Sequence, residues 1–211
     1  MKTDDLIELL AEDATPQWPF RRLFDIALLA AVAACAVAFF ATIGPRPDFA
    51  HAAETVRFPF KFVVTLTLAT GAVGLSLAMA RPGVRTGPWL WLLAAAPLLL
   101  LAGVAAELAV VPREAWMTRL VGHNSAFCLR VIPLLAVAPL ACFLLVLRRG
   151  APAHAGRAGA LAGLAAGGIA ATFYAAHCPD DSPLFVAVWY SVAIAIVTAA
   201  GYLGGRRLLA W

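Results

Sequence analysis

Residues 177–183 read HCPDDSP, a short polar stretch with two prolines and no lysine or arginine. Long apolar runs lie directly before and after it, at residues 158–176 and 184–204. A helix needs about 20 apolar residues to cross roughly 30 Å of hydrocarbon, and both runs come close to that length. The polar stretch is therefore predicted to connect two membrane-spanning helices and to hold Cys178 at one face of the membrane.

Four further apolar runs precede these two, at residues 23–43, 60–80, 88–111 and 126–147. The composition agrees, since 63% of the 211 residues are hydrophobic, only 13% are charged, and the mean hydropathy is +0.86. Runs containing glycine and proline do not form lipid-exposed strands, because unpaired backbone groups in hydrocarbon are costly. We predict an all-α fold, a polytopic membrane bundle of six transmembrane helices.

Basic residues predict the orientation of this bundle. With six spans, both termini share one side with the even-numbered connections, and ten basic residues fall there against six on the other side. The pairs at 21–22, 148–149 and 206–207 all agree with this bias. The positive-inside rule then places both termini in the cytoplasm. We expect a multi-pass protein of the bacterial inner membrane, and the net charge of +4 is too small and scattered to indicate nucleic-acid binding.

The first 22 residues differ from the rest and form an acidic leader and a hinge. One lysine stands against five acids in residues 1–13, which gives a net charge of −4. Thr3 is a candidate N-cap, and leucine and isoleucine at 6, 7, 9 and 10 make an apolar stripe. The leader is either a solvated segment without a role or a short helix that docks on a basic soluble partner. We divide the chain into this leader (1–22), a transmembrane sensor domain (23–205) and a basic tail (206–211).

Two of the four cysteines, Cys128 and Cys178, fall on the side away from the termini. Cys128 lies near the start of its predicted helix with Arg130 close in sequence, and both features favour a reactive thiol. The periplasm is oxidising, so a disulfide would persist there. Neighbouring helices lie about 8–10 Å apart, from which a loop cysteine can close a disulfide. Cys35 and Cys142 are interpreted as packing residues.

Other interpretations of this pair stay open. His123 and His177 add two nitrogen ligands, so a metal site of Cys128, Cys178 and these histidines competes with a disulfide, although the spacing matches no tight motif. A permanent staple or an incidental pair is also compatible with the sequence. The chain contains no C-x-x-C pair, and we find no Ser/His/Asp set or phosphate loop. We therefore expect neither an enzyme nor a bound cofactor.

Charged and small residues in the apolar runs predict further contacts. Glu107 lies about one turn from the end of its span, where we expect it to pair with Arg113, Arg119 or Arg130. Lys61 lies at the start of a span and is expected to extend to the membrane surface. Glycines four residues apart, at 159, 163 and 167 and at 201 and 205, predict close helix packing and leave a homodimer open.

The chain resembles the NrsF family of integral-membrane anti-sigma factors. The resemblance rests on the acidic leader, six apolar helices, FPFK at 58–61, GHNS at 122–125 followed by Cys128, HCPDDSP at 177–183 and WY at 189–190. It implies a protein that sequesters an extracytoplasmic-function (ECF) sigma factor through its leader and releases it under metal or oxidative stress. The two periplasmic cysteines of the family correspond to Cys128 and Cys178.

This resemblance also guides the choice of site residues. The residues expected to support the cysteine sensor are His123, His177, Arg130, Asp180 and Asp181. The residues expected to bind the sigma factor are Asp4, Asp5, Leu6, Leu9, Leu10 and Glu12. The competing function is a metal-ion transporter or permease that uses the same cysteines and histidines. It would need polar groups along a path through the midplane, which the predicted helices almost lack.

Overall fold

A computed structural model describes residues 18–80, 86–150 and 152–209, and within these ranges the chain is helical and contains no strand. The long helices are α2 (Phe20–Thr42), α4 (Arg57–Met79), α5 (Gly87–Val110), α7 (Ser125–Leu147), α8 (Ala155–Ala175) and α10 (Ser191–Leu208). The short elements are α3 (Phe49–Ala53), η1 (Arg113–Ala115), α6 (Trp116–Val121), α9 (Pro183–Phe185) and η2 (Val186–Tyr190).

Six helices of the described chain are long and apolar enough to cross a membrane. They coincide with the six predicted runs, so the predicted all-α transmembrane bundle is confirmed. The sixth span is continuous from Pro183 to Leu208, because α9 leads through one π-helical turn, η2, into α10. Arg206 and Arg207 lie in the last turn of α10.

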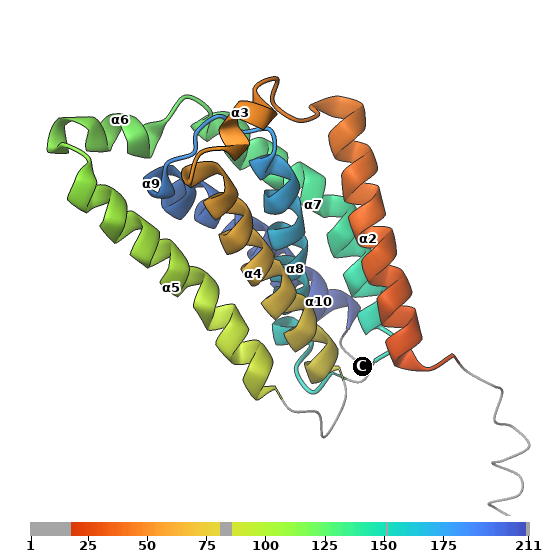
Figure 1. Cartoon of the computed structure of the whole chain (residues 1–211). Coiled ribbons are helices and arrows are strands. Elements are labelled where there is room, and N and C mark those ends of the chain that lie inside the picture. Colours follow the sequence, from red (N-terminus) through yellow and green to blue (C-terminus); the bar gives the residue numbers. More distant parts are fainter. Residues whose placement is uncertain (1–17, 81–85, 151, 210–211) are drawn as a thin grey trace, which may run out of the picture.

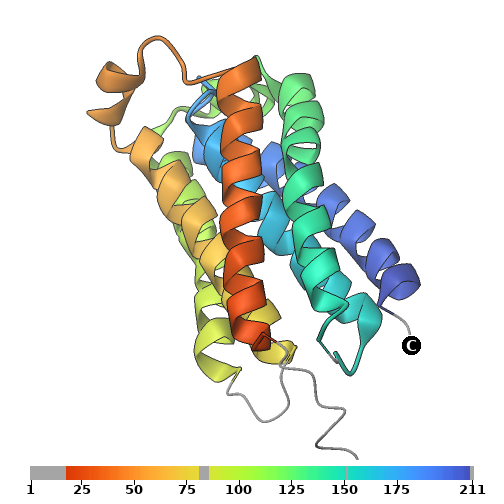
Figure 2. The same cartoon turned by 90° about the vertical axis from the view of Figure 1, so that its right-hand side faces the viewer.

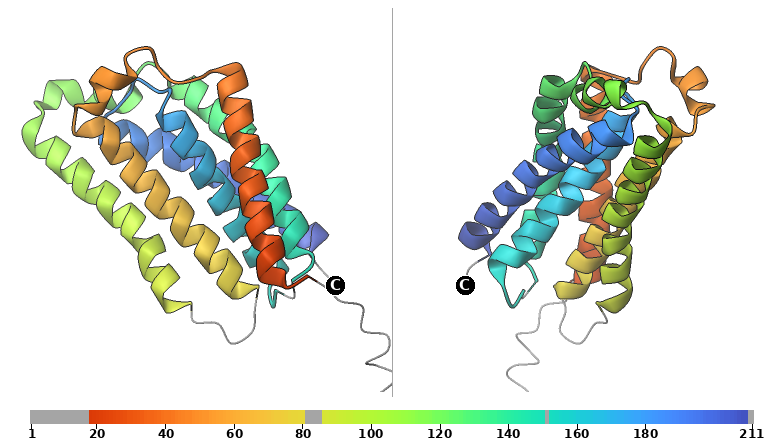
Figure 3. Two further views of the ribbon diagram at one scale, coloured as in Figure 1. Left: turned by 45° about the vertical axis from the view of Figure 1, so that its right-hand side comes forward. Right: turned by 90° about the vertical axis from the view of Figure 1, so that its left-hand side faces the viewer.

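The helix α8 lies at the centre of the bundle (Figures 1 and 2). It packs against α2, α4, α7 and α10, and most of its length is buried. The helix α5 lies on the outside against α4 and leans away from the other spans (Figure 3). The described chain begins and ends at one end of the bundle, here called the terminal end. The opposite end, called the distal end, is formed by residues 43–56, 111–125 and 176–182.

The closest helix pair is α8 with α10, and glycines make it possible. A Cβ atom on Gly159 would press on the carbonyl oxygen of Gly201 and lie 2.6 Å from the Cα atom of Gly205. Conversely, a Cβ atom on Gly201 would lie 2.8 Å from the Cα atom of Gly163. The two predicted glycine faces therefore pack on each other within one chain.

This contact leads to a first prediction. Gly159→Ala should lower the free energy of unfolding by about 1–3 kcal/mol, because the new methyl group forces two backbones apart. Gly204→Ala on α10 is the control, since its Cβ would meet only the flexible end of Leu144. Thermal unfolding in detergent measures both variants. Equal midpoints would contradict the role assigned to the glycine contact.

Charge is distributed differently at the two ends. At the distal end, Arg46, Lys61 and Arg119 form close ion pairs with Asp48, Asp181 and Glu107. At the terminal end, six exposed arginines have no acidic partner among the described residues: Arg22, Arg148, Arg149, Arg157, Arg206 and Arg207. Among the described residues, the excess of positive charge therefore lies at the terminal end.

Candidate sensor site

The loop after α8 places Cys178 in the interior of the distal end. The chain turns at Ala176 and His177, and the Cys178 amide donates to the Tyr174 carbonyl at 3.0 Å. Cys128 lies in the first turn of α7, where its amide donates to the Asn124 carbonyl at 2.8 Å. Both cysteines have no exposed surface, and their thiols lie near enough to interact electrostatically. The structure thus brings together the two cysteines singled out in the sequence.

All four cysteines lie in the described part of the chain, and none of them forms a disulfide. Cys35 is buried in the core on α2, as the packing interpretation predicts. Cys142 lies on α7 toward the terminal end and is partly buried. Cys128 and Cys178 are therefore both free and closed off from solvent in this structure.

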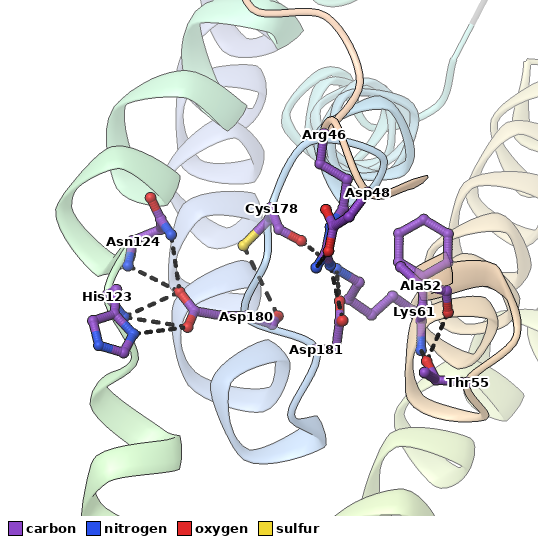
Figure 4. A network of polar contacts seen from close by, with 11 residues as sticks. Arg46, Asp48, Ala52, Thr55, Lys61, His123, Asn124, Cys178, Asp180 and Asp181 are labelled. Carbon is purple, nitrogen blue, oxygen red and sulfur yellow. Dashed lines mark hydrogen bonds and ion pairs between the residues drawn. The ribbon is translucent and has the colours of Figure 1, made fainter. Parts of the chain in front are cut away.

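Asp180 ties the Cys178 loop to the turn that precedes α7. Its carboxylate accepts hydrogen bonds from the backbone amides of His123 at 3.1 Å and Asn124 at 2.9 Å (Figure 4). Gly122 makes this possible, because its φ of 58° lies in the left-handed region. A Cβ atom there would also lie 2.8 Å from the Asp180 carboxyl carbon. Asp180 thus fixes Cys178 relative to the helix that carries Cys128.

Asp181 ties the same loop to the other side of the bundle. One carboxylate oxygen pairs with the Lys61 ammonium at 2.6 Å, and the other accepts from Arg46 Nη1 at 2.9 Å. Lys61 also donates to the Cys178 carbonyl at 2.8 Å (Figure 4). Arg46 in turn holds both carboxylate oxygens of Asp48, and these bonds keep the pKa of the Asp48 carboxyl below its usual range.

Lys61 does not extend to the membrane surface as predicted. Its side chain is 0% exposed and points inward to the Cys178 loop. The interior position is tolerated because Asp181 and the Cys178 carbonyl replace the water that an ammonium group would otherwise bind. The residue belongs to the site, and its place in the FPFK stretch was the only sequence signal for it.

Two tyrosines complete the buried cluster and were not predicted as site residues. Tyr174 on α8 and Tyr190 in η2 have ring centroids 5.6 Å apart and interact with the two thiols. Among the described residues, neither hydroxyl has a hydrogen-bond partner of good geometry. A π-helical turn often marks a functional position. Here it places Tyr190 beside Cys178.

Burial controls the reactivity of the thiols. It raises the pKa of the Cys178 thiol above its usual range, and the Lys61 ammonium opposes this rise. Cys128 is fully buried, whereas Arg130 is exposed and has no ion pair in the part of the chain described here. Arg130 therefore does not lie beside the thiol that it was expected to support. A reagent reaches either cysteine only after the distal end opens.

The histidines are directed away from the thiols. His177 Nδ1 donates to the Gly44 carbonyl at 2.9 Å, and the ring packs against Phe127. The His123 side chain is 88% exposed, with Nδ1 at 3.7 Å from Asp180. No three His, Cys, Asp or Glu side chains of the described ranges are grouped so as to hold a metal ion. The four candidate metal ligands therefore do not form a ready-made site.

A second buried acid lies at the same end. Glu107 pairs with Arg119 at 2.9 Å, which was among the predicted partners, and with Arg57 at 3.5 Å, which was not. Its side chain is only 2% exposed. This ion pair joins α5 to α4 and α6 and is separate from the thiol cluster.

These features define a class of protein. It is a helical, multi-pass membrane protein in which Cys128, Cys178 and the Lys61–Asp181 ion pair form one closed cluster at the distal end. The chain belongs to the NrsF family, described as "Negative regulator of sigma F", which matches residues 10–211. It is therefore a negative regulator of a sigma factor and not an enzyme.

Two curated relatives match over the whole of both chains. The anti-sigma-F factor NrsF of Caulobacter vibrioides is 34% identical to this chain over 216 aligned positions. The probable anti-sigma-F factor NrsF of Azospira oryzae is 30% identical over the same length. No solved structure matches the chain. The resemblance inferred from the cysteine motifs and the acidic leader is thereby confirmed.

Proposed function

We propose that the chain holds an ECF sigma factor at the bacterial inner membrane through its leader and releases it when Cys128 and Cys178 are modified. The observation that carries this proposal is the meeting of both thiols in one buried cluster at the distal end. The expected sigma-binding residues, Asp4, Asp5, Leu6, Leu9, Leu10 and Glu12, lie outside the described residues. A hundredfold loss of sigma affinity corresponds to about 2.7 kcal/mol, a modest coupling energy.

In this proposal the terminal end faces the cytoplasm and the distal end faces the periplasm. Two observations support this orientation. Among the described residues, six exposed arginines without an acidic partner lie at the terminal end and only two, Arg113 and Arg130, at the distal end, in agreement with the positive-inside rule. At the distal end, four of the six basic residues are instead held in ion pairs within the protein.

The chemical step is a modification of both thiols. With hydrogen peroxide, one S–S bond forms between Cys128 and Cys178, and the two protons and two electrons released by the thiols reduce one peroxide molecule to two water molecules. A thiophilic metal ion would instead displace the thiol protons and bind both sulfurs. Either change joins two buried thiols that are not bonded in this structure, and the surrounding loop must adjust to the new geometry.

Replacing one thiol tests this proposal. Cys128→Ala should still repress the target genes, but induction by peroxide or metal should fall about tenfold or more, because one sulfur cannot complete the modification. Alanine is preferred because a hydroxyl at this buried position would be left unpaired. Cys142→Ala on the same helix is the matched control. A target-gene reporter with normal induction in Cys128→Ala would remove the cysteines from the mechanism.

No observation favours the transporter alternative. The buried polar residues of the described chain are Lys61, Thr65, Ser76, Glu107 and Ser182. Thr65 and Ser76 bond to carbonyls of their own helix. Lys61 lies near the start of α4, Glu107 in the last turn of α5 and Ser182 directly before α9, and these positions belong to the distal end. A transport path would instead place polar groups across the midplane.

A further inference from the structure

We infer that α2 is the element that carries the signal from the Cys178 loop to the leader, and that Arg46 and His177 are the positioning residues that couple them. The inference rests on the proposed function, in which the leader holds the sigma factor. It differs from a signal passed only through the helices that carry the cysteines. The basis is a set of contacts between the Cys178 loop and the segment that follows α2.

Three hydrogen bonds or ion pairs join these two segments. The Arg46 amide donates to the Ala176 carbonyl at 3.0 Å, and His177 Nδ1 donates to the Gly44 carbonyl at 2.9 Å. The Arg46 guanidinium donates to Asp181 at 2.9 Å, and only 11% of its side chain is exposed. These bonds involve residues on both sides of Cys178. A displacement of Cys178 therefore moves the end of α2.

The connector between these contacts and α2 is stiff. Gly44 closes α2 with a φ of 61°, and its amide donates to the Phe39 carbonyl at 2.9 Å. Pro45 and Pro47 then flank Arg46, and proline fixes the backbone φ angle. A stiff connector transmits a displacement, whereas a flexible one would absorb it. The sequence Gly-Pro-Arg-Pro thus suits a mechanical link.

The helix α2 is itself suited to move as one body. Its 23 residues make a rod roughly 34 Å long at about 1.5 Å per residue. It begins at Phe20, within the hinge that ends the leader segment of residues 1–22. Only one stripe of α2 is buried, formed by Phe24, Ala31, Cys35 and Phe39. A helix that is buried along only one narrow stripe can tilt and shift slightly at lower energetic cost than a helix packed on all sides.

The test measures the oxidation of the thiols separately from the release of the sigma factor. The full chain is placed in nanodiscs with its cognate sigma factor and treated with hydrogen peroxide. Thiol-alkylation mass shifts report the oxidation of Cys128 and Cys178, and the retained sigma factor is measured separately. The decisive variant is Arg46→Gln/His177→Phe, which removes both side-chain contacts and keeps the ring at 177. Arg113→Gln, an exposed arginine of the distal end, is the matched control.

We expect both thiols to oxidise in the double variant as they do in the parent, while sigma release falls about tenfold. Equal oxidation with equal release would overturn the coupling through α2. A different result would contradict the proposed function itself. If the parent chain keeps its sigma factor after full oxidation, these thiols do not control release.

A second variant decides the matter if the double variant holds no sigma factor before oxidation. Pro45→Gly/Pro47→Gly loosens the connector but leaves all three contacts with the Cys178 loop in place. We expect it to bind the sigma factor and to release it about threefold to tenfold less on oxidation. Unchanged release from this variant overturns the inference.

Discussion

Asp181→Asn should lower the stability of the bundle by about 3–5 kcal/mol, the cost of removing one partner from a buried ion pair. The substitution leaves the Lys61 ammonium, which is 0% exposed, without its counter-charge. Only the Cys178 carbonyl and a neutral amide would remain to solvate it. Thermal unfolding of the purified chain in detergent, followed by circular dichroism, measures the loss.

The same network supplies the matched control. Asp48→Asn is the same chemical change on the other carboxylate that Arg46 holds, but the Asp48 side chain is 53% exposed. It should cost less than about 1 kcal/mol, as exposed pairs do. The double variant Lys61→Met/Asp181→Asn should recover part of the loss, because it removes the stranded cation as well. Equal unfolding midpoints for Asp181→Asn and Asp48→Asn would show that the buried ammonium does not depend on Asp181.

The six spans could be predicted because hydrocarbon thickness imposes a length that hydropathy reveals directly. Cys128 and Cys178 could be placed at one end of the bundle, because helices that alternate in direction determine which connections share a side. Glu107 could be assigned an arginine partner because a membrane-embedded carboxylate needs one. Each of these conclusions depends on local sequence and on a simple alternation of helices.

Lys61 could not be placed correctly by the same reasoning. A lysine at the start of a span usually extends to the interface, and its inward turn depends on Asp181, which lies far away in sequence. The glycine spacing likewise predicted close helix packing, but it did not predict which helix packs against α8. Either α10 or a helix of a second chain could present the small-residue surface that such packing needs. Arg46 and Tyr174 gave no local signal at all, and Tyr190 was marked only as part of the WY pair at 189–190. Their roles arise from contacts that only the folded bundle creates.

The glycine contact also bears on the open question of a homodimer. The faces at Gly159 and Gly201 are occupied by each other, so they are not available to a second chain. A homodimer would therefore have to use another surface. The glycine spacing is no longer an argument for a homodimer.

Deleting residues 1–17 should abolish repression while the bundle still inserts, because the described domain begins at α2 and buries its own core without them. We expect target expression to rise about a hundredfold or more, since the proposed sigma-binding surface is lost entirely. A pull-down from detergent-solubilised membranes, with partners identified by mass spectrometry, compares the full chain with the shortened one.

Point variants in the leader make this test specific. Leu9→Ser/Leu10→Ser replaces two of the four residues of the apolar stripe and should weaken capture strongly, whereas Glu8→Gln changes one charge and should weaken capture only slightly. A sigma factor retained only by the full chain would assign capture to residues 1–17 and make the thiol and α2 experiments the next step. A sigma factor retained equally by the shortened chain would move the binding surface to the arginines of the terminal end. In that case α2 would no longer be needed as a link, because α7, α8 and α10 carry most of those arginines directly.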